Sequence, residues 1–228
     1  MKNIAQIIDS TLLKANTTMA DIEKLCQDAI ENNIYSICIN PCYVSYAKKL
    51  LVDSNVKICA VVGFPLGANN IEIKKSEIRN AYFDGADEID FVVNIGKFLS
   101  GDYEYVSNEI NQMDINCYNS GMVSKIIIET SMLSVPQICD ICDMIKHTDI
   151  NYIKTSTGFG SRGATVEDIK IIKSMVGKRK LIKASGGIKD YLTAKAMRDA
   201  GASRIGTSNA IQIIEGEKLY EKLRKLRY

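Results

Sequence analysis

Hydrophobic residues in this chain gather in short runs, which are separated by longer segments of mixed polarity. Seven runs are clear, and they lie at 36–40, 57–64, 88–96, 124–130, 151–156, 180–185 and 203–208. An eighth run is expected near 7–11. Runs this short, rich in Ile and Val and apolar on both faces, are typical of strands in a parallel sheet that is covered on both sides.

The segments between the runs have the spacing of amphipathic helices. The clearest of them lie at 21–33, 44–54, 71–86, 165–177 and 191–201. Gly85, Gly177 and Gly201 stand where a helix commonly ends on glycine. The basic end of the chain, KLYEKLRKLRY, predicts a solvated amphipathic helix.

Strands that alternate with helices at this pitch predict parallel strands joined by crossover helices. Eight such units in 228 residues favour a (β/α)8 TIM barrel that forms one domain over 1–228. An open doubly wound sheet is the alternative. Such a sheet usually has a glycine-rich turn after its first strand, and IDSTLLKANTT contains no glycine.

Composition narrows the functional classes. The chain has 29 basic and 27 acidic residues, a net charge of +2, which gives no reason to propose a nucleic-acid partner. No apolar run reaches membrane-spanning length, and the start MKNIAQIIDSTLLK lacks the apolar core of a secretory signal. Seven cysteines, an odd number, fit reduced thiols. We therefore expect a cytoplasmic protein that does not contact membranes.

Cys139 and Cys142 form a CxxC motif with His147 nearby. A zinc or redox role is one interpretation, but no second ligand pair has suitable spacing. The segment VPQICDICDMIKH also has helical spacing, so the two thiols can simply pack in a core. We expect no metal. His147 is the only histidine, which disfavours a Ser-His or Cys-His mechanism.

Polar residues collect at the expected carboxyl ends of the strands, where barrel enzymes place their catalytic groups. They are Asp9, Cys38, Asn40, Asp90, Asn94, Glu129, Lys154, Lys183, Ser208 and Asn209.

Two of these residues, Lys154 and Lys183, are lysines on adjacent strands, in IKTSTG and IKASGG. Repulsion between neighbouring ammonium groups and loss of water both lower an amine's pKa. A neutral amine is the nucleophile that forms a Schiff base with a carbonyl substrate. One lysine would attack while the other stays cationic. Asp90 can transfer protons or can form a structural salt bridge with a lysine, and its position in the sequence does not decide between these roles.

Glycines suggest a second part of the site. Gly186 and Gly187 precede one helical segment, and Gly206 with Ser208 precedes the last. Free backbone N–H groups near a helix N-terminus bind anions, and barrels often hold phosphate after their seventh and eighth strands. Gly158 can add another N–H group, and Arg162 is a candidate phosphate partner. The absence of a P-loop argues against a nucleoside triphosphate.

The chain resembles the deoxyribose-phosphate aldolase family of class I aldolases. The resemblance is carried by IDSTLLK, SICINP, VVGFPLGA, GADEIDFVVNIG, KIIIET, YIKTSTGFGSRGATVEDI, IKASGGI and AGASRIGTS, which span nearly the whole chain. It implies that Lys154 is the Schiff-base lysine, that Lys183 tunes it and that Asp90 belongs to the proton relay.

The same resemblance implies the remaining site residues. Cys38, Asp9 and Thr11 would line the substrate pocket. The phosphate cradle would consist of Gly158, Gly186, Gly187, Gly206, Ser208 and Asn209. Some positions depart from the usual family pattern and bear on phosphate contacts, affinity and stability: Ser10, Ala15, Ser131, Arg162, Asn209 and Ala210.

The implied reaction is reversible cleavage of 2-deoxy-D-ribose 5-phosphate to D-glyceraldehyde 3-phosphate and acetaldehyde, in deoxyribose phosphate catabolism. It needs no metal or organic cofactor, and a homodimer is expected. Some family members have a mobile C-terminal tail that ends in a tyrosine and can approach the site, and this chain also ends in a tyrosine, Tyr228. A frayed terminus is the simpler interpretation. Three alternatives remain: an aldolase or transaldolase for another sugar phosphate, a metal-dependent aldolase, and a non-catalytic barrel that binds a phosphorylated ligand.

Overall fold

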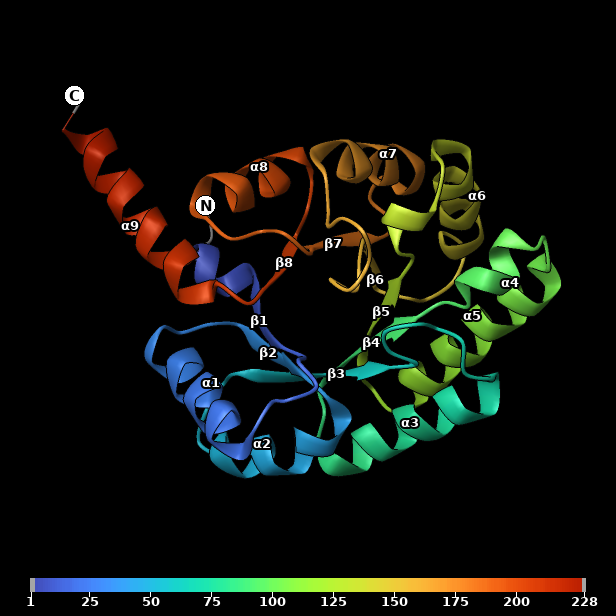
Figure 1. The fold of residues 1–228 in the computed structure, drawn as a ribbon, viewed down its shortest axis with the longest axis horizontal. Helices are drawn as coiled ribbons and strands as arrows, with labels where there is room; N and C mark the ends of the chain where they lie inside the picture. Colours follow the sequence, from blue (N-terminus) through green and yellow to red (C-terminus); the bar gives the residue numbers. More distant parts are fainter. Residues whose placement is uncertain (1–2, 227–228) are drawn as a thin grey trace.

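The strands of the protein close into a barrel. A computed structural model describes residues 3–226, which form eight parallel strands in sequence order with helices around them (Figure 1). Each strand pairs with the next along the chain, and β8 pairs with β1 to close the barrel. The predicted (β/α)8 barrel is confirmed, and the alternative of an open doubly wound sheet is wrong.

Each of the eight predicted runs overlaps a strand. The strands are β1 (Ile8–Leu12), β2 (Ser36–Ile39), β3 (Lys57–Val62), β4 (Glu88–Val92), β5 (Val123–Ile127), β6 (Tyr152–Lys154), β7 (Leu181–Ser185) and β8 (Arg204–Thr207). Most stop before the predicted end, because the chain leaves the barrel to begin the next helix. Asn40, Asn94 and Glu129 consequently lie just beyond β2, β4 and β5 and not in them.

Helices surround the barrel. They are α1 (Met19–Glu31), α2 (Val44–Leu50), α3 (Ile71–Asp84), α4 (Ile95–Leu99), α5 (Tyr103–Asn119), α6 (Val135–Ile145), α7 (Val166–Val176), α8 (Tyr191–Ala200) and α9 (Ala210–Lys225). Short 3-10 turns are η1 (Ile4–Ile7), η2 (Pro41–Tyr43) and η3 (Thr130–Met132). Gly85, Gly177 and Gly201 end α3, α7 and α8, as predicted.

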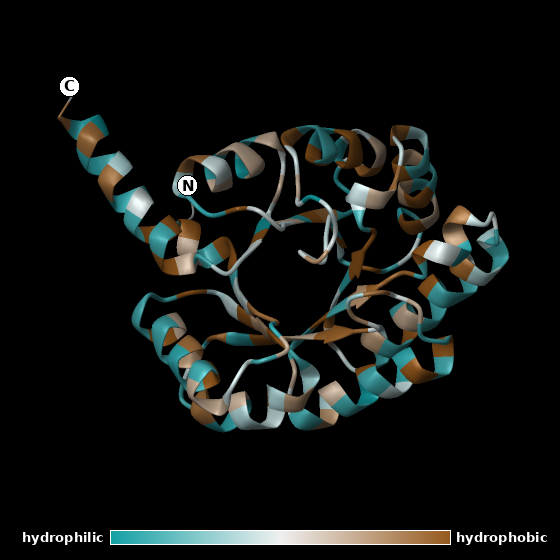
Figure 2. Ribbon diagram, viewed as in Figure 1, coloured by the Kyte–Doolittle hydropathy of each residue, from teal (hydrophilic) through white to brown (hydrophobic). Residues whose placement is uncertain are grey.

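Local sequence explains where several helices begin. Thr18 and Asp21 form a capping box at the start of α1, and Thr165 and Asp168 form another at the start of α7. The helices alternate hydrophilic and hydrophobic residues, whereas the strands are largely hydrophobic (Figure 2). The helices therefore bury one face against the barrel and leave the other in water.

The apolar core lies mainly between the barrel wall and the helices. Successive strand residues point to opposite faces of a sheet, and in β4 Ile89 and Phe91 belong to this outer core. Glu88 and Asp90 alternate with them and are buried inside the barrel. Among residues 3–226, a small separate apolar cluster in the barrel interior consists of Leu13, Cys38, Cys59 and Val61. Charged side chains occupy much of the rest.

The two cysteines of the CxxC motif lie outside the barrel. Cys139 and Cys142 lie on α6 with free thiols, and burial raises the pKa of Cys142 to about 12. A thiol that is buried and protonated supports packing over metal or redox chemistry.

The outer part of α9 projects away from the barrel (Figure 1). Tyr228 lies outside the described residues. Within residues 3–226, no helix combines the length and apolar character needed to cross a membrane.

Candidate active site

Lys154 and Lys183 lie side by side inside the barrel. They are register partners on β6 and β7, and both are buried. The side-chain nitrogens donate hydrogen bonds to the same oxygen of Asp90, Oδ2, at 2.6 Å from Lys154 and 2.7 Å from Lys183. The two nitrogens are therefore close to each other, and the structure brings the three candidate catalytic residues into direct contact.

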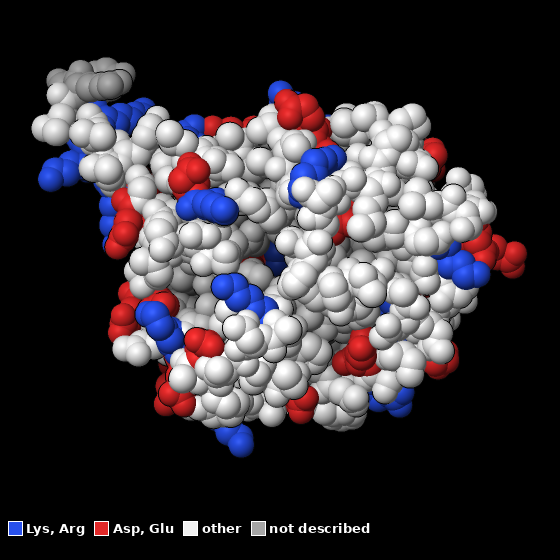
Figure 3. Space-filling model, viewed as in Figure 1, with Lys and Arg blue, Asp and Glu red and all other residues white. Residues whose placement is uncertain are grey.

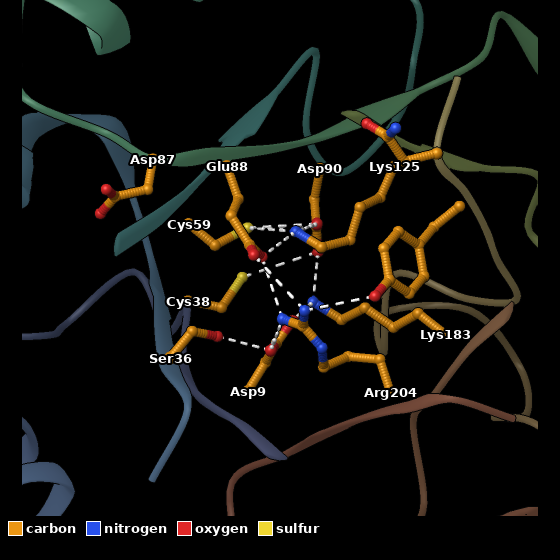
Figure 4. A network of polar contacts seen from close by, with 12 residues as sticks. Asp9, Ser36, Cys38, Cys59, Asp87, Glu88, Asp90, Lys125, Lys183 and Arg204 are labelled. Carbon is orange, nitrogen blue, oxygen red and sulfur yellow. Dashed lines mark hydrogen bonds and ion pairs between the residues drawn. The ribbon is translucent and has the colours of Figure 1, made fainter. Parts of the chain in front are cut away.

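Asp90 and Lys183 belong to a larger network of buried charges (Figure 4), which Lys154 joins through its contact with Asp90. Lys125 pairs with Oδ1 of Asp90 at 2.9 Å and with Glu88 at 2.7 Å. Arg204 pairs with Asp9 at 2.7 Å and with Glu88 at 3.0 Å, and Asp9 also pairs with Lys183. The network thus joins three carboxylates to four basic side chains inside the barrel.

Sequence reasoning missed three members of this network: Glu88, Lys125 and Arg204. It considered only polar residues at strand ends, whereas these lie further down the strands. A signal was present, since each is a charged residue inside an apolar run. Glu88 also stands two positions before Asp90 and therefore shares its face of β4.

The network fixes the charges of its members. Burial alone would lower the pKa of Lys183, but the carboxylates of Asp9 and Asp90 raise it above the ordinary lysine value. Burial alone would raise the pKa of Asp90, but Lys125, Lys154 and Lys183 hold it well below the ordinary value. At neutral pH, Lys183 is therefore cationic and Asp90 is a carboxylate.

Lys154 differs from its neighbours because it opens onto a cavity of about 350 Å³. Eight of the predicted site residues line this Lys154 cavity: Thr11, Lys154, Gly158, Gly186, Gly187, Gly206, Ser208 and Asn209. Figure 3 shows a hollow near the centre of the face that is in view, with Lys or Arg side chains beside it. A larger hollow of about 610 Å³, beside α1 and α2, contains none of the predicted site residues.

The other four predicted residues, Asp9, Cys38, Asp90 and Lys183, do not line the Lys154 cavity. All four are fully buried in the network or beside it. Asp9 accepts hydrogen bonds from Ser36 and Arg204, and the Cys38 thiol donates to Asp90 at 3.7 Å. The resemblance placed Asp9 and Cys38 in the pocket wall. In the structure they lie beneath it, because neither stands at the very end of its strand.

The glycine loops that line the cavity suit an anion. Gly186 and Gly187 have φ of 83° and 74°, a left-handed conformation that favours glycine. Asp190 caps the N-terminus of α8 with its own carboxylate, whereas the Asn209 side chain makes no such hydrogen bond to α9. The free first turn is therefore that of α9, which favours an anion beside Ser208 and Asn209.

Two lysines that sequence reasoning overlooked, Lys14 and Lys189, also line the cavity. Lys189 follows directly on the Gly186–Gly187 turn, which was an available signal. Arg162, by contrast, does not line the cavity. Its guanidinium pairs with Asp168 and donates to the carbonyl of Thr130 at 3.1 Å, so these contacts hold it away from the candidate phosphate site.

Glu129 organises the loop after β6. Its carboxylate accepts hydrogen bonds from the backbone N–H of Thr157 at 2.9 Å and from its hydroxyl at 2.6 Å. These contacts fix the segment that carries Gly158 and Phe159, both of which line the cavity.

One group of potential metal ligands occurs among residues 3–226. The Sγ atoms of Cys38 and Cys59 and a carboxylate oxygen of Asp90 lie within 4.8 Å of one another. The same carboxylate already contacts Lys125, Lys154 and Lys183. A metal ion at this position would face these ammonium groups, so the donor set fits a cation poorly.

The likeness to known proteins extends over most of the chain. Residues 3–213 match the model of the DeoC/LacD family of aldolases. Deoxyribose-phosphate aldolase of Caldanaerobacter subterraneus subsp. tengcongensis is 48% identical, over 94% of this chain and 94% of that protein.

Solved structures agree. The aldolase QR15 superposes with a TM-score of 0.91 at 38% identity, covering 98% of this chain and 99% of that one. The tetrameric deoxyribose phosphate aldolase of Aeropyrum pernix has a TM-score of 0.88 at 30% identity, covering 94% and 91%. The family resemblance in the motifs is confirmed: this chain belongs to the DeoC/LacD family of aldolases.

Proposed function

We propose that this enzyme reversibly cleaves 2-deoxy-D-ribose 5-phosphate to D-glyceraldehyde 3-phosphate and acetaldehyde, through a Schiff base on Lys154. The observation that carries the proposal is the position of Lys154. It bonds to Asp90 beside a cationic Lys183, and it lines a cavity whose glycine loops suit a phosphate. The deoxyribose-phosphate aldolase activity of the similar proteins supports the choice of substrate.

Charge balance supports Lys154 as the nucleophile. The buried network contains the carboxylates of Asp9, Glu88 and Asp90, and the basic groups Lys125, Lys154, Lys183 and Arg204. An unbalanced buried charge is costly, so the network favours one neutral base. Lys154 is the member whose side chain faces the cavity, and a neutral amine there can attack a carbonyl carbon.

Cleavage then follows from the electron sink that the amine creates. The amine of Lys154 adds to C1 of the open-chain sugar, and loss of water gives an iminium ion. A base removes the proton of the C3 hydroxyl, the C2–C3 bond breaks, and its electron pair moves into the iminium to form an enamine. Glyceraldehyde 3-phosphate leaves. Protonation of the enamine at C2 and hydrolysis of the iminium release acetaldehyde and restore the amine.

Asp90 and Lys183 have distinct parts in this scheme. Asp90 is ionised and touches the reacting nitrogen, so it can guide protons to and from the substrate with the help of water. Lys183 stays positively charged beside Lys154 and makes a second positive charge there unfavourable. The protein supplies the electron sink itself, so the scheme uses no metal or organic cofactor.

Phosphate binding would hold the substrate at the correct distance from Lys154. Gly186, Gly187 and the start of α9 line the same cavity, where backbone N–H groups can bind an anion, and Lys14 and Lys189 add positive charge to it. Binding energy from this remote group positions the reacting carbon for attack.

Trapping with borohydride tests the proposal. Purified enzyme mixed with acetaldehyde and sodium borohydride should gain a reduced adduct on Lys154, which peptide mass spectrometry locates. Cleavage of deoxyribose 5-phosphate should be measured in the same preparation and should survive a chelator. A label on a different residue, or turnover without any label, would contradict the assignment. Preference for a different sugar phosphate in a substrate panel would overturn the proposed substrate.

We also propose that the chain forms one domain and works as a homodimer in the cytoplasm, as the resemblance implies. The free thiols of its seven cysteines support a reducing compartment. Light scattering on the eluting peak of a size-exclusion column measures the subunit number directly, and a monomer or tetramer would replace the homodimer.

A further inference from the structure

A second buried lysine, Lys74 on α3, lies outside the barrel wall and pairs with Glu109 on α5 at 2.5 Å. Both side chains are fully buried. The other two N–H donors of Lys74 go to the carbonyls of Gly67 and Val92, each at 2.8 Å. Every hydrogen of this ammonium group is therefore used, and none remains for a ligand.

These contacts join the loop after β3 to the carboxyl end of β4. Gly67 belongs to the loop and Val92 ends β4, while the second oxygen of Glu109 accepts from the backbone of Asn94 at 2.7 Å. The loop approaches very closely, because a Cβ on Gly67 would lie 2.1 Å from the carbonyl oxygen of Val93. The Lys74–Glu109 pair thus fixes the loop against the strand that carries Asp90.

The start of the loop is held as well. The backbone N–H of Gly63 donates to Glu77 at 2.6 Å, and the N–H of Gly67 donates to the carbonyl of Gly63 at 2.7 Å. A Cβ on Gly63 would lie 2.7 Å from Cε of Lys74, so the lysine stem packs directly under the loop. Phe64 is consequently held between two anchored glycines.

Phe64 is the residue of this loop that reaches the candidate active site. The centre of its ring lies 6.0 Å from the Lys154 nitrogen. Its ring also packs edge-on against Phe159, with 5.5 Å between ring centres, and Phe159 lines the Lys154 cavity. The two rings form an aromatic cover beside the amine, assembled from the loops after β3 and β6.

We propose that Lys74 and Glu109 are positioning residues that hold Phe64 beside Lys154, where the ring stabilises the iminium ion and keeps water away from it. The proposal rests on the Schiff-base function proposed above. The face of an aromatic ring attracts a cation, and exclusion of water strengthens that attraction. Lys74 itself touches no substrate, so it acts through the loop.

A double-mutant cycle tests this chain of contacts. Lys74→Met and Phe64→Leu should each lower kcat about tenfold, the range expected for one partly desolvated cation–aromatic contact. KM for deoxyribose 5-phosphate should change less than twofold, because the candidate phosphate site is on the loops after β7 and β8 and includes neither Lys74 nor Phe64. Both changes together should lower kcat no more than one does, since they remove the same effect. Independent, multiplying losses would overturn the proposal.

Stability needs its own control, because Lys74→Met leaves the Glu109 carboxylate buried without a partner. The double variant Lys74→Met/Glu109→Leu removes both charges and should fold better while keeping the tenfold loss of kcat. Ile141→Ala, in the buried core on α6, provides a matched destabilisation without loop contacts and should leave kcat unchanged. An unchanged kcat in the double variant would also overturn the proposal.

A readout that does not depend on activity separates this proposal from the proposed function. The chain has no tryptophan, so Phe64→Trp introduces a single tryptophan at the cover, whose emission can be excited selectively over that of the tyrosines. In the Phe64→Trp protein, acrylamide should quench the tryptophan more strongly when Lys74→Met or Lys74→Met/Glu109→Leu is added. Adding Ile141→Ala should leave the quenching as it is in Phe64→Trp alone. Equal quenching in all variants would refute positioning even if wild type proved to be an aldolase. Stronger quenching would support it even if deoxyribose 5-phosphate were not the substrate.

Discussion

Lys74 and Lys154 are both lysines buried against a carboxylate, yet their surroundings differ in one decisive way. Lys74 gives its three donors to Glu109, Gly67 and Val92. Among the described residues, Lys154 donates to Asp90, and its remaining side faces the cavity. The first amine is enclosed by protein, whereas the second has room for a substrate.

The charges around Lys74 also differ from those at the centre of the barrel. Burial lowers the pKa of Lys74 and raises the pKa of Glu109, and their mutual attraction offsets this only in part. At the barrel centre, by contrast, several basic side chains surround Asp90 and overcome the cost of its burial, so its pKa is lowered. A buried lysine therefore becomes a candidate nucleophile through an open cavity and a charged neighbour, and burial alone is insufficient.

The largest expected difference between the two lysines is in catalysis. Lys154→Met should lower kcat by at least about 10⁴-fold, because it removes the covalent path on which the rate enhancement depends. Asp90 keeps Lys125 and Lys183 as partners, so the free energy of unfolding should fall little. Lys74→Met should do the reverse, with about 3–5 kcal/mol lost from stability and only a tenfold loss of kcat.

Steady-state kinetics, borohydride trapping and urea unfolding on the same preparations measure this contrast. Adduct formation in Lys154→Met, or its loss in folded Lys74→Met, would reverse the roles that we assign to the two lysines.

The carboxylate partners should differ next. Asp90→Asn should lower kcat by about 10²- to 10⁴-fold, the usual contribution of a group that transfers protons. Glu109→Gln keeps an oxygen that can accept from Lys74 and should cost tenfold or less. Rapid-quench measurement of the first turnover locates the affected step. Comparable losses in the two variants would remove Asp90 from proton transfer and leave it a structural role.

Lys183→Leu tests the charged neighbour through pH. The folded pKa of Lys183 is raised above 10.5, so its charge and its contribution to stability are present below that pH and disappear only as pH rises through the folded value. Without this charge, the pH profile of activity should move to higher pH. Activity at pH 7 should fall about tenfold, which corresponds to one pH unit, and should recover as pH approaches 9. A profile of unchanged shape between pH 6 and 10 would exclude this tuning role.

The smallest expected effect concerns Lys189. Lys189→Met should raise KM for deoxyribose 5-phosphate about twofold to fivefold, as expected for one solvent-exposed charge pair. Cleavage of 2-deoxyribose without phosphate should be unaffected, which provides the matched control within one variant. An equal change for both sugars would show that Lys189 contacts another part of the substrate.

Lys154, Lys183 and Gly186 could be predicted from the sequence because each lies in a distinctive local pattern at a strand end. The full network of buried charges could not be predicted in the same way. Arg204 and Asp9 are 195 positions apart, and they meet because β8 closes the barrel against β1. Glu88 and Lys125 were visible as charges in apolar runs. Lys125 pairs with Glu88 and Asp90 on the neighbouring strand β4, whereas the contact of Glu88 with Arg204 depends on which strand faces which across the barrel.

The amino-acid sequence by itself determined the eight strands, most of the helices and their glycine ends, because these depend on periodicity and on contacts a few residues apart. Tertiary structure alone decided that α9, and not α8, offers a free N-terminus, and that Arg162 is occupied by Asp168. It also decided which buried lysine is enclosed and which faces a cavity. Such differences depend on the packing of distant segments, which local sequence does not encode.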